Sequence, residues 1–262
     1  MTDVSAGNAI TQYIQLRGST TLLGPMQAIG SQYMDEYPSV GLPLLGGGTS
    51  AGYKSVLDGT ADIGMASGAM PEDMEIWANA HKHAVRSINI AYDGIAVIVN
   101  ASNPITNLTL VQLRDIFTGR LNNWNELCKL SGKINVYSHH PQRGTYEPWK
   151  RLVVGKEHIT LGAQIVNDHK ELFANLLKDP LGISYVSTTF LGKANLKVLS
   201  VNDFLPSYEN LSTNQYPIRN NLMLIAPEQT SDHVKQFIDY CLSPTKGQTL
   251  IKKNGLVPIV TE

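Results

Sequence analysis

The sequence predicts an α/β protein with mostly parallel sheets. Apolar segments of strand length alternate along the chain with segments whose apolar residues recur at helical spacing. No two of these strand segments are joined by a hairpin turn, which favours helical connections between them. In such sheets ligands bind where the carboxyl ends of strands lead into helices, so the loops at those ends are the first place to look for a site.

The composition limits the classes of partner. The chain has 262 residues, of which 42% are hydrophobic and 16% charged, as in globular proteins of one large or two medium domains. The formal net charge is −1, which gives no indication of a nucleic-acid or membrane-surface partner. An anionic ligand would therefore be bound by local donors and not by a general positive field.

The sequence holds no motif for a membrane span, a metal or a cofactor. No apolar run approaches the roughly 20 residues that a membrane helix needs. The two cysteines, Cys128 and Cys241, have no metal-ligand spacing and do not indicate a redox compartment. Residues 1–7 lack the basic and apolar segments of a signal peptide, so the protein is either cytoplasmic or the sequence is that of a mature chain. We expect neither a metal nor a cofactor.

The first strand and helix place hydroxyl groups at a helix N-terminus. Residues 13–17 are a strand candidate that runs into the sequence GSTT at 18–21. Apolar and aromatic residues of the next segment fall on one helical face between Leu22 and Tyr37. Ser19 and Thr20 therefore lie at the start of a helix, where they either cap the helix or contact an anionic ligand.

A second loop of this kind is rich in glycine. Residues 44–52 read LLGGGTSAG, and a helix-compatible segment runs from Ala51 to Leu57. The glycines let the backbone approach a ligand closely, and Thr49 and Ser50 add hydroxyl donors at a helix N-terminus, whose dipole favours negative charge. The alternative is a glycine-rich turn that binds nothing.

The remaining elements continue the alternation. Thr109 and Gln112 form a capping-box pattern at the start of a helix, and Thr145 can cap the helix that carries Trp149. Gly144 and Thr145 thus form a third hydroxyl-bearing loop, and convergence of several such loops would make this protein an oxyanion binder. Further strand candidates are 61–67, 88–91, 94–100, 134–137, 181–186 and 222–225.

These segments, in this order, resemble the periplasmic phosphate-binding proteins of ABC importers. The resemblance covers the chain from about residue 16 to residue 258. The matching stretches are GSTT at 18–21, GGGTSAG at 46–52, ADIGMAS at 61–67, DGIAVIVN at 93–100, LRDIFTG at 113–119, NWN at 123–125, RGT at 143–145, DPLGISY at 179–185, LSP at 242–244 and GLVP at 255–258.

The resemblance implies a two-lobed α/β fold of the type II periplasmic-binding-protein class. In this fold the ligand lies in a cleft between two mixed-sheet lobes that are joined by a two-strand hinge. One lobe would hold residues 8–92 and 222–262, and the other residues 101–217. The hinge strands would be 93–100 and 216–222.

The resemblance also implies a ligand and partners. The protein would bind phosphate and deliver it to the membrane subunits of an ABC transporter, as a monomer, in the periplasm or anchored to lipid outside the cell. For each implied contact, capping or turn formation without a ligand is the alternative, and Ser67 is indicated chiefly by the resemblance. The implied contacts are Ser19, Thr20, Thr49, Ser50, Ser67, Gly144 and Thr145.

The sequence departs from the family pattern in its arginines. His139 stands where the family has an arginine, Arg143 where it has a serine, and Gly68 where many relatives have an arginine. Either Arg143 supplies the charge-assisted contact to the oxyanion from a new position, or the site relies on neutral donors. In the second case His139 would contribute charge only when it is protonated.

A carboxylate in the site would favour phosphate over sulfate. The second pKa of a phosphate group is about 6, so phosphate carries a proton for part of the time near neutral pH and can donate it to an acceptor. Asp93, at a strand start near the expected hinge, is the better candidate, and Asp62, which can instead orient a turn, is the other.

Two other classes of function compete with phosphate capture. A receptor for another oxyanion, such as molybdate, tungstate or sulfate, or for a small phosphorylated or carboxylated molecule is the main rival, and a sensor is another. An enzyme on this fold is not expected, because the sequence shows no nucleophile–base–acid set, nucleotide-binding fingerprint or metal motif.

Overall fold

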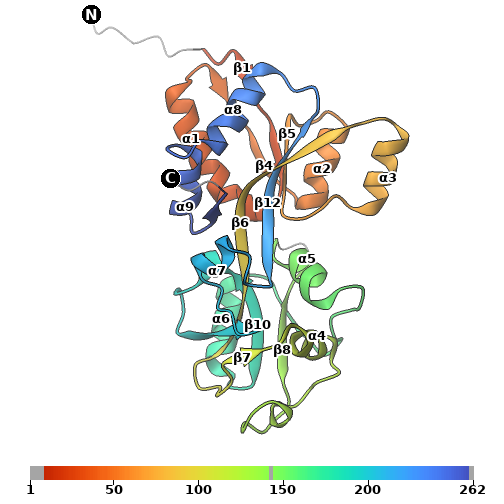
Figure 1. Cartoon of the computed structure of the whole chain (residues 1–262), viewed down its shortest axis with the longest axis vertical. Helices are drawn as coiled ribbons and strands as arrows, with labels where there is room; N and C mark the ends of the chain where they lie inside the picture. Colours follow the sequence, from red (N-terminus) through yellow and green to blue (C-terminus); the bar gives the residue numbers. More distant parts are fainter. Residues whose placement is uncertain (1–8, 142–143, 260–262) are drawn as a thin grey trace, which may run out of the picture. The chain divides into compact units, whose positions relative to one another are not determined.

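The computed structural model describes residues 9–141 and 144–259, which form two compact units. Unit 1 holds the residues up to Ala91, Leu222–Asn254 and the residues from Pro258 on, and unit 2 holds Tyr92–Asn221 and Gly255–Val257. Two long strands, β6 (Val85–Asn100) and β12 (Arg219–Pro227), have residues in both units (Figure 1). The division into units rests on contacts within each unit and does not place the two units relative to each other. The lobe and hinge bounds inferred from the sequence therefore stay a prediction.

Unit 1 is built on the strand order β4–β2–β5–β12. β2 (Leu16–Gly18) pairs in parallel with β4 (Leu44–Gly46) and with β5 (Ile63–Ala66), and β12 runs antiparallel to β5. β1 (Gln12–Tyr13) and β3 (Val40–Gly41) form a separate parallel pair. The helices of unit 1 are η1 (Thr20–Leu22), α1 (Leu23–Glu36), α2 (Thr49–Leu57), α3 (Glu72–Ala80), α8 (Asp232–Leu242) and α9 (Gly247–Lys253).

Three glycines let α2 lie directly against the strands of unit 1. A Cβ on Gly52 would lie 2.4 Å from the carbonyl oxygen of Met65, and a Cβ on Gly18 would lie 2.1 Å from the same oxygen. A Cβ on Gly64 would lie 2.6 Å from the carbonyl oxygen of Gly52. Because no side chain fits at these positions, the backbone of α2 touches the backbones of β2 and β5. The first turns of α2 are thereby held at the carboxyl ends of the two strands.

Unit 2 is built on a mixed sheet with the strand order β6–β10–β8–β9. β10 (Gly182–Ser187) runs antiparallel to β6 and parallel to β8 (Asn135–His139), which pairs in parallel with β9 (Gln164–Val166). β11 (Leu196–Val201) pairs with β6 and β7 (Asn107–Leu108), and β13 (Val257–Pro258) pairs with β6. The helical segments are α4 (Leu110–Thr118), η2 (Trp124–Glu126), α5 (Tyr146–Trp149), the π-helical η3 (Lys150–Val154), α6 (His169–Lys178), η4 (Thr188–Phe190) and α7 (Tyr208–Ser212).

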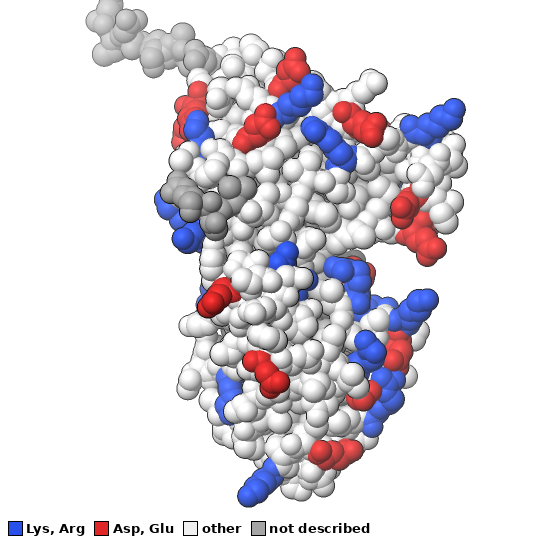
Figure 2. All heavy atoms as spheres, viewed as in Figure 1, with Lys and Arg blue, Asp and Glu red and all other residues white. Residues whose placement is uncertain are grey.

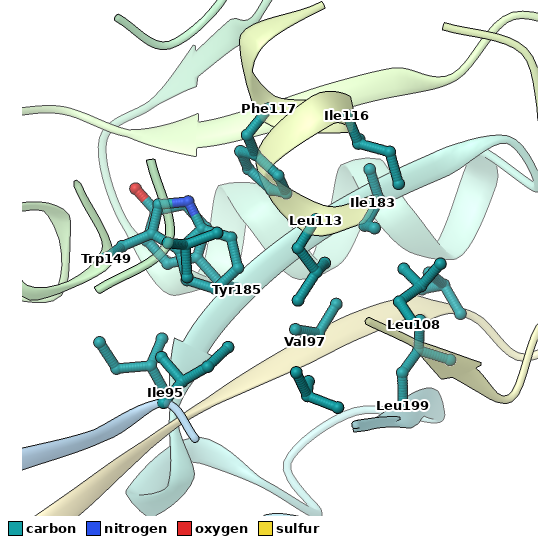
Figure 3. Packing of buried hydrophobic residues seen from close by; sticks show 14 of the residues in the cluster. Ile95, Val97, Leu108, Leu113, Ile116, Phe117, Trp149, Ile183, Tyr185 and Leu199 are labelled. Atoms are coloured by element: carbon teal, nitrogen blue, oxygen red, sulfur yellow. The ribbon is translucent and has the colours of Figure 1, made fainter. Parts of the chain in front are cut away.

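The core of unit 2 lies between its sheet and α4. Leu113, Ile116 and Phe117 of α4 face residues of β6 and β10 (Figure 3). Trp149 stacks on Tyr185 with ring centroids 4.2 Å apart and an interplanar angle of 3°. This aromatic pair fixes α5 against β10.

The structure corrects the sequence-based interpretation at two points and refines it at a third. Antiparallel pairs of β6 with β10 and β11, and of β5 with β12, accompany the parallel pairs, so the sheets are mixed, as the resemblance implied. β6 runs unbroken where two strands, 88–91 and 94–100, were expected, because Asp93 is buried and accepts hydroxyl hydrogen bonds instead of ending the strand. Helix α2 begins at Thr49 and not at Ala51, directly after Gly48, whose φ of 86° lies outside the helical region.

Two further features bear on the sequence-based expectations. The predicted capping box is confirmed, since Thr109 Oγ1 accepts from the Gln112 N–H and Gln112 Oε1 accepts from the Thr109 N–H. Over the described ranges, no helix combines the length and the apolar character that crossing a membrane requires.

Candidate functional site

Three loops meet at one edge of the sheet of unit 1. The parallel register pairs Gly18 of β2 with Gly46 of β4 and with Met65 of β5, so the carboxyl ends of the three strands lie side by side. The loops are also joined by backbone hydrogen bonds: the Ser19 N–H donates to the Met65 carbonyl at 2.8 Å, and the Gly48 N–H donates to the Gly18 carbonyl at 3.0 Å. The hydroxyl-bearing segments predicted from the sequence at 19–21 and 49–50 are therefore neighbours.

Thr49 and Ser67 contact each other directly. The Ser67 N–H donates to Thr49 Oγ1 at 3.0 Å, and the two hydroxyl oxygens also lie 3.0 Å apart. Ser67 is buried, Thr49 is half-buried, and Ser50 beside it is exposed. The contact links the start of α2 to the end of β5 and orients two hydroxyl groups at the same edge of the sheet.

No acidic side chain of α2 itself neutralises the N-terminus of this helix. Its first turn holds no acidic residue, and no side chain caps it. The Gly52 N–H is bonded to the Gly48 carbonyl at 3.1 Å, whereas the N–H groups of the first helical residues have no carbonyl one turn earlier in the helix. The positive end of the helix dipole thus lies at the meeting point of the three loops, where it favours an anion.

The Ser19 hydroxyl is buried without a partner. Ser19 is 1% exposed, and its Oγ has no hydrogen bond to any residue in the described part of the chain. It does not cap η1, and neither η1 nor α1 has an acidic residue in its first turn. A buried hydroxyl without a partner costs about 1–3 kcal/mol, so this group is placed as a ligand contact would be. Thr20 beside it is exposed.

Arg17 is a residue that the sequence-based reasoning missed. It is the last residue of β2 before Gly18, it is exposed, and its Nε lies 3.8 Å from the position that a Cβ on Gly47 would take. Its guanidinium group forms no ion pair with a described residue. The signal in the sequence was its place directly before GSTT, at the end of a strand.

In unit 2, the predicted contacts lie on the loop between β8 and α5. Thr145 is buried and precedes α5 as its N-cap residue, but its side chain forms no capping hydrogen bond, so the predicted capping by Thr145 is wrong. Gly144 is half-buried beside it. Arg143 lies outside the described residues. The Thr145 hydroxyl is thus not used to stabilise the helix that follows.

His139 ends β8 inside unit 2. It is fully buried, and its Nε2 lies 3.0 Å from the Tyr185 carbonyl oxygen. Since a carbonyl oxygen only accepts, Nε2 carries the proton. The imidazole also packs against His169 and Tyr185, with ring centroids 5.5 and 5.2 Å away. These contacts tie His139 to the interior of its own unit.

The two candidate carboxylates are both hydrogen-bonded within their own units. Asp93 Oδ1 accepts from Ser187 Oγ at 2.9 Å and from Thr188 Oγ1 at 3.1 Å, and burial raises the pKa of Asp93 to about 6. Asp62 Oδ2 accepts from the Gln15 N–H at 2.8 Å, at the start of β5 and away from its carboxyl end. Asp62 thus ties the start of β5 to the segment before β2, and its role as a ligand contact stays a prediction.

Where the three loops of unit 1 meet, the polar groups described above are hydroxyls, helix N–H groups and one arginine. All of these groups can donate hydrogen bonds. Within residues 9–141 and 144–259, no group of three or more His, Cys, Asp or Glu side chains is placed to hold a metal ion.

Comparison with known proteins decides the family. A family model described as the PBP superfamily domain matches residues 3–245, which is most of the chain. The chain belongs to the PBP superfamily. Among curated members, it is 24% identical to the phosphate-binding protein PstS of Bacillus subtilis (strain 168) over 247 residues, which are 94% of this chain and 80% of that protein.

Solved PBP superfamily structures match the fold. One, from Clostridium perfringens, contains bound phosphate and is named as a phosphate ABC transporter substrate-binding protein; it is 29% identical, with a TM-score of 0.80, and the match covers 95% of this chain and 100% of that one. An ABC-type phosphate transport receptor from Vibrio cholerae is 24% identical, with a TM-score of 0.84 and coverage of 93% and 99%. The family and the mixed α/β fold implied by the sequence resemblance are confirmed.

Proposed function

We propose that this protein captures inorganic phosphate outside the cytoplasm and delivers it to the membrane subunits of an ABC importer. The names of its relatives support phosphate as the ligand. The single observation on this chain that carries the proposal is the buried Ser19 hydroxyl, which lacks a partner at an edge where helix N–H groups and further hydroxyls meet. Such a set of donors matches a tetrahedral oxyanion.

The ligand contacts implied by the sequence resemblance stay part of the proposal. In unit 1 they are the groups at Ser19 and Thr20, at Thr49 and Ser50, and at Ser67. In unit 2 they are Gly144 and Thr145, whose hydroxyl is not engaged in capping. Arg143 stays a prediction from the family pattern. A ligand role for His139 and Asp93 also stays a prediction, and the bonds of these two residues inside unit 2 argue for a supporting position instead.

We further propose that Arg17 supplies positive charge to this site. Its Nε lies against the Gly47 loop, beside a helix N-terminus that has no acidic residue in its first turn. A cation without an ion-pair partner and the positive end of a dipole repel each other, and an anion bound between them relieves the repulsion. Arg17 thus offers a permanent positive charge to a site in which Gly68 replaces an arginine of the family pattern.

A second candidate function is capture of a different oxyanion. The observation that favours it is the absence of arginine at two positions where the family pattern has one, since His139 and Gly68 stand there. Sulfate and molybdate are tetrahedral anions that neutral donors also fit.

The relatives are binding proteins, and we propose that this chain binds as a monomer and catalyses no reaction.

Isothermal titration calorimetry with phosphate, sulfate, molybdate and a phosphate monoester tests the function. We expect saturable binding of phosphate at one site per chain, and weaker or no binding of the other three anions. Binding of molybdate or sulfate with no heat from phosphate would overturn phosphate capture in favour of the second candidate. An absence of heat with all four anions would overturn both.

Replacing Ser19 by alanine separates ligand contact from structural support. We expect Ser19→Ala to lower phosphate affinity about tenfold, because one hydrogen bond to a charged group is lost, while stability stays equal or rises because a buried unpaired hydroxyl is removed. Ser184→Ala is the control, since Ser184 is equally buried but donates to the Tyr137 carbonyl at 2.9 Å. The control should lose stability and keep its affinity. The same pattern in both variants would contradict the assignment of Ser19.

Replacing Arg17 by glutamine tests the charge. We expect Arg17→Gln to weaken phosphate binding by about threefold to tenfold at low salt, and by less at high salt, because the contribution of an exposed charge is screened. Arg86→Gln, which removes an exposed arginine from β6, is the matched control and should bind as the native chain does. Equal affinity of Arg17→Gln and the native protein at low salt would remove Arg17 from the site.

A further inference from the structure

A cavity in unit 1 lies between α2 and α3, and its lining differs from that of the anion site. Its volume is about 410 Å³, within the range of small-molecule pockets. Each helix contributes residues spaced three and four positions apart, which therefore share one face. The lining residues are Lys54 and Leu57 of α2, Asp58 directly after it, and Asp73, Met74 and Trp77 of α3.

The charge of the cavity is negative. Lys54 is paired with Asp58 at 2.8 Å, which neutralises the one cation of the lining. Asp73 forms no ion pair with a described residue, and it belongs to an acidic first turn that also holds Glu72 and Glu75. Acidic side chains gather on the surface where α3 begins (Figure 2). A cation entering the cavity would meet the unpaired Asp73 carboxylate.

Trp77 gives the cavity an aromatic wall that is held in place. The residue is 44% exposed, although large aromatic side chains are usually more buried. His81 and His83 both stack on its indole, with ring centroids 4.3 and 5.4 Å away, and His81 Nδ1 lies 2.8 Å from the Trp77 carbonyl oxygen. A fixed indole face attracts cations through its quadrupole, more strongly than the other aromatic side chains do.

We propose that this cavity binds a small organic cation with an apolar chain, of the alkylguanidinium or alkylammonium type. The charged group would lie between the Asp73 carboxylate and the Trp77 indole, and the apolar chain would lie against Leu57 and Met74. An inorganic cation would leave the apolar wall unused, and an anion would be repelled by the start of α3. The proposal is independent of phosphate capture, because none of the six lining residues belongs to the anion site.

Titration with n-butylguanidinium, and with n-butylurea as its neutral analogue, tests the proposal. Intrinsic fluorescence is a selective readout, since Trp124 and Trp149 are fully buried and Trp77 is exposed. We expect a saturable change with the guanidinium compound, and binding of the urea that is weaker by at least about fivefold, because the charge supplies the carboxylate and cation–π contacts. Equal binding of the two compounds would overturn the proposal. So would a guanidinium titration that does not saturate by about 20 mM, because a site of millimolar affinity is nearly filled at that concentration.

Two matched variants locate the site. Asp73→Asn should weaken n-butylguanidinium binding by at least about fivefold, because the charge-assisted contact is lost. Glu72→Gln removes a neighbouring charge that does not line the cavity and should change the affinity by less than about twofold. Both variants should bind phosphate as the native chain does. Equal effects of the two substitutions would indicate a general surface charge effect and would contradict a built site.

Discussion

Gly52→Ala should lower the stability of the protein by about 1–3 kcal/mol and should weaken anion binding as well, although a single methyl group is added. The new Cβ would lie 2.4 Å from the Met65 carbonyl oxygen and 3.2 Å from the Arg17 carbonyl oxygen. Both are backbone atoms of paired strands, so no side-chain rotation relieves the overlap. Helix α2 must move away, and the Thr49–Ser67 contact moves with it. Urea unfolding and phosphate calorimetry on the variant measure the two effects.

Gly24→Ala is the control for the added methyl group. Gly24 also lies near the start of a helix, and a Cβ there would meet nothing within 4 Å. Because alanine is a better helix former than glycine by about 1 kcal/mol, this variant should be as stable as the native chain or slightly more stable. If Gly52→Ala behaved in the same way, the close contact between α2 and β5 would not be what positions the anion site.

The loops of unit 1 could be predicted from the sequence because their signals are local. Glycine runs, hydroxyl residues and the onset of a helical pattern lie within a few residues of one another at 18–21 and 46–52. The parallel pairing of three short strands then brings these loops to one edge. The Thr49–Ser67 contact and the burial of the Ser19 hydroxyl are details of that edge that only the structure shows.

Other features depended on contacts that the sequence does not display. Asp93 interrupted an apolar pattern and therefore divided one strand into two in the sequence analysis, but Ser187 and Thr188 on a distant segment satisfy its carboxylate. The helix start at Thr49 was placed two residues late, because glycine and threonine both have low helix propensity and Gly52 is required by packing instead. Arg17 was missed because its one signal, its place directly before GSTT, does not show which way an arginine in a strand points.

Asp93→Asn should remove a pH-dependent loss of stability that the native protein shows between about pH 4 and pH 6. Burial raises the pKa of Asp93 from 3.8 to about 6, so the folded protein holds this proton more tightly than the unfolded chain does. Stability from this group is fully present below about pH 4 and is lost as the pH rises through about 6. The rise in pKa corresponds to about 3 kcal/mol. Asparagine keeps the acceptor oxygen for Ser187 and Thr188 and carries no charge at any pH in this range.

Urea unfolding at pH 4, 5, 6 and 7 gives the free energy of unfolding of the variant and of the native protein. The readout is how the difference between these two free energies changes with pH. This difference should shift in favour of Asp93→Asn by about 2–2.5 kcal/mol over the series, whatever its value at pH 4, because part of the effect is already lost at pH 4. Asp58→Asn is the control, because hydrogen bonds from Lys54 and Thr60 lower the pKa of Asp58 to about 2, and its titration lies below the window. A flat difference for Asp93→Asn would mean that the Ser187 and Thr188 hydrogen bonds outweigh burial and that Asp93 is ionised throughout.

Phosphate affinity of the same variant decides between the two roles of Asp93. If Asp93 accepts the proton of the bound anion, Asp93→Asn should lose affinity, and phosphate should lose its advantage over sulfate. If Asp93 only joins β6 to the end of β10 and the start of η4 through Ser187 and Thr188, affinity and selectivity should stay within about twofold of native while the stability profile changes as above. We expect the second result, because the carboxylate is 2% exposed and already accepts two hydroxyl hydrogen bonds from its own unit.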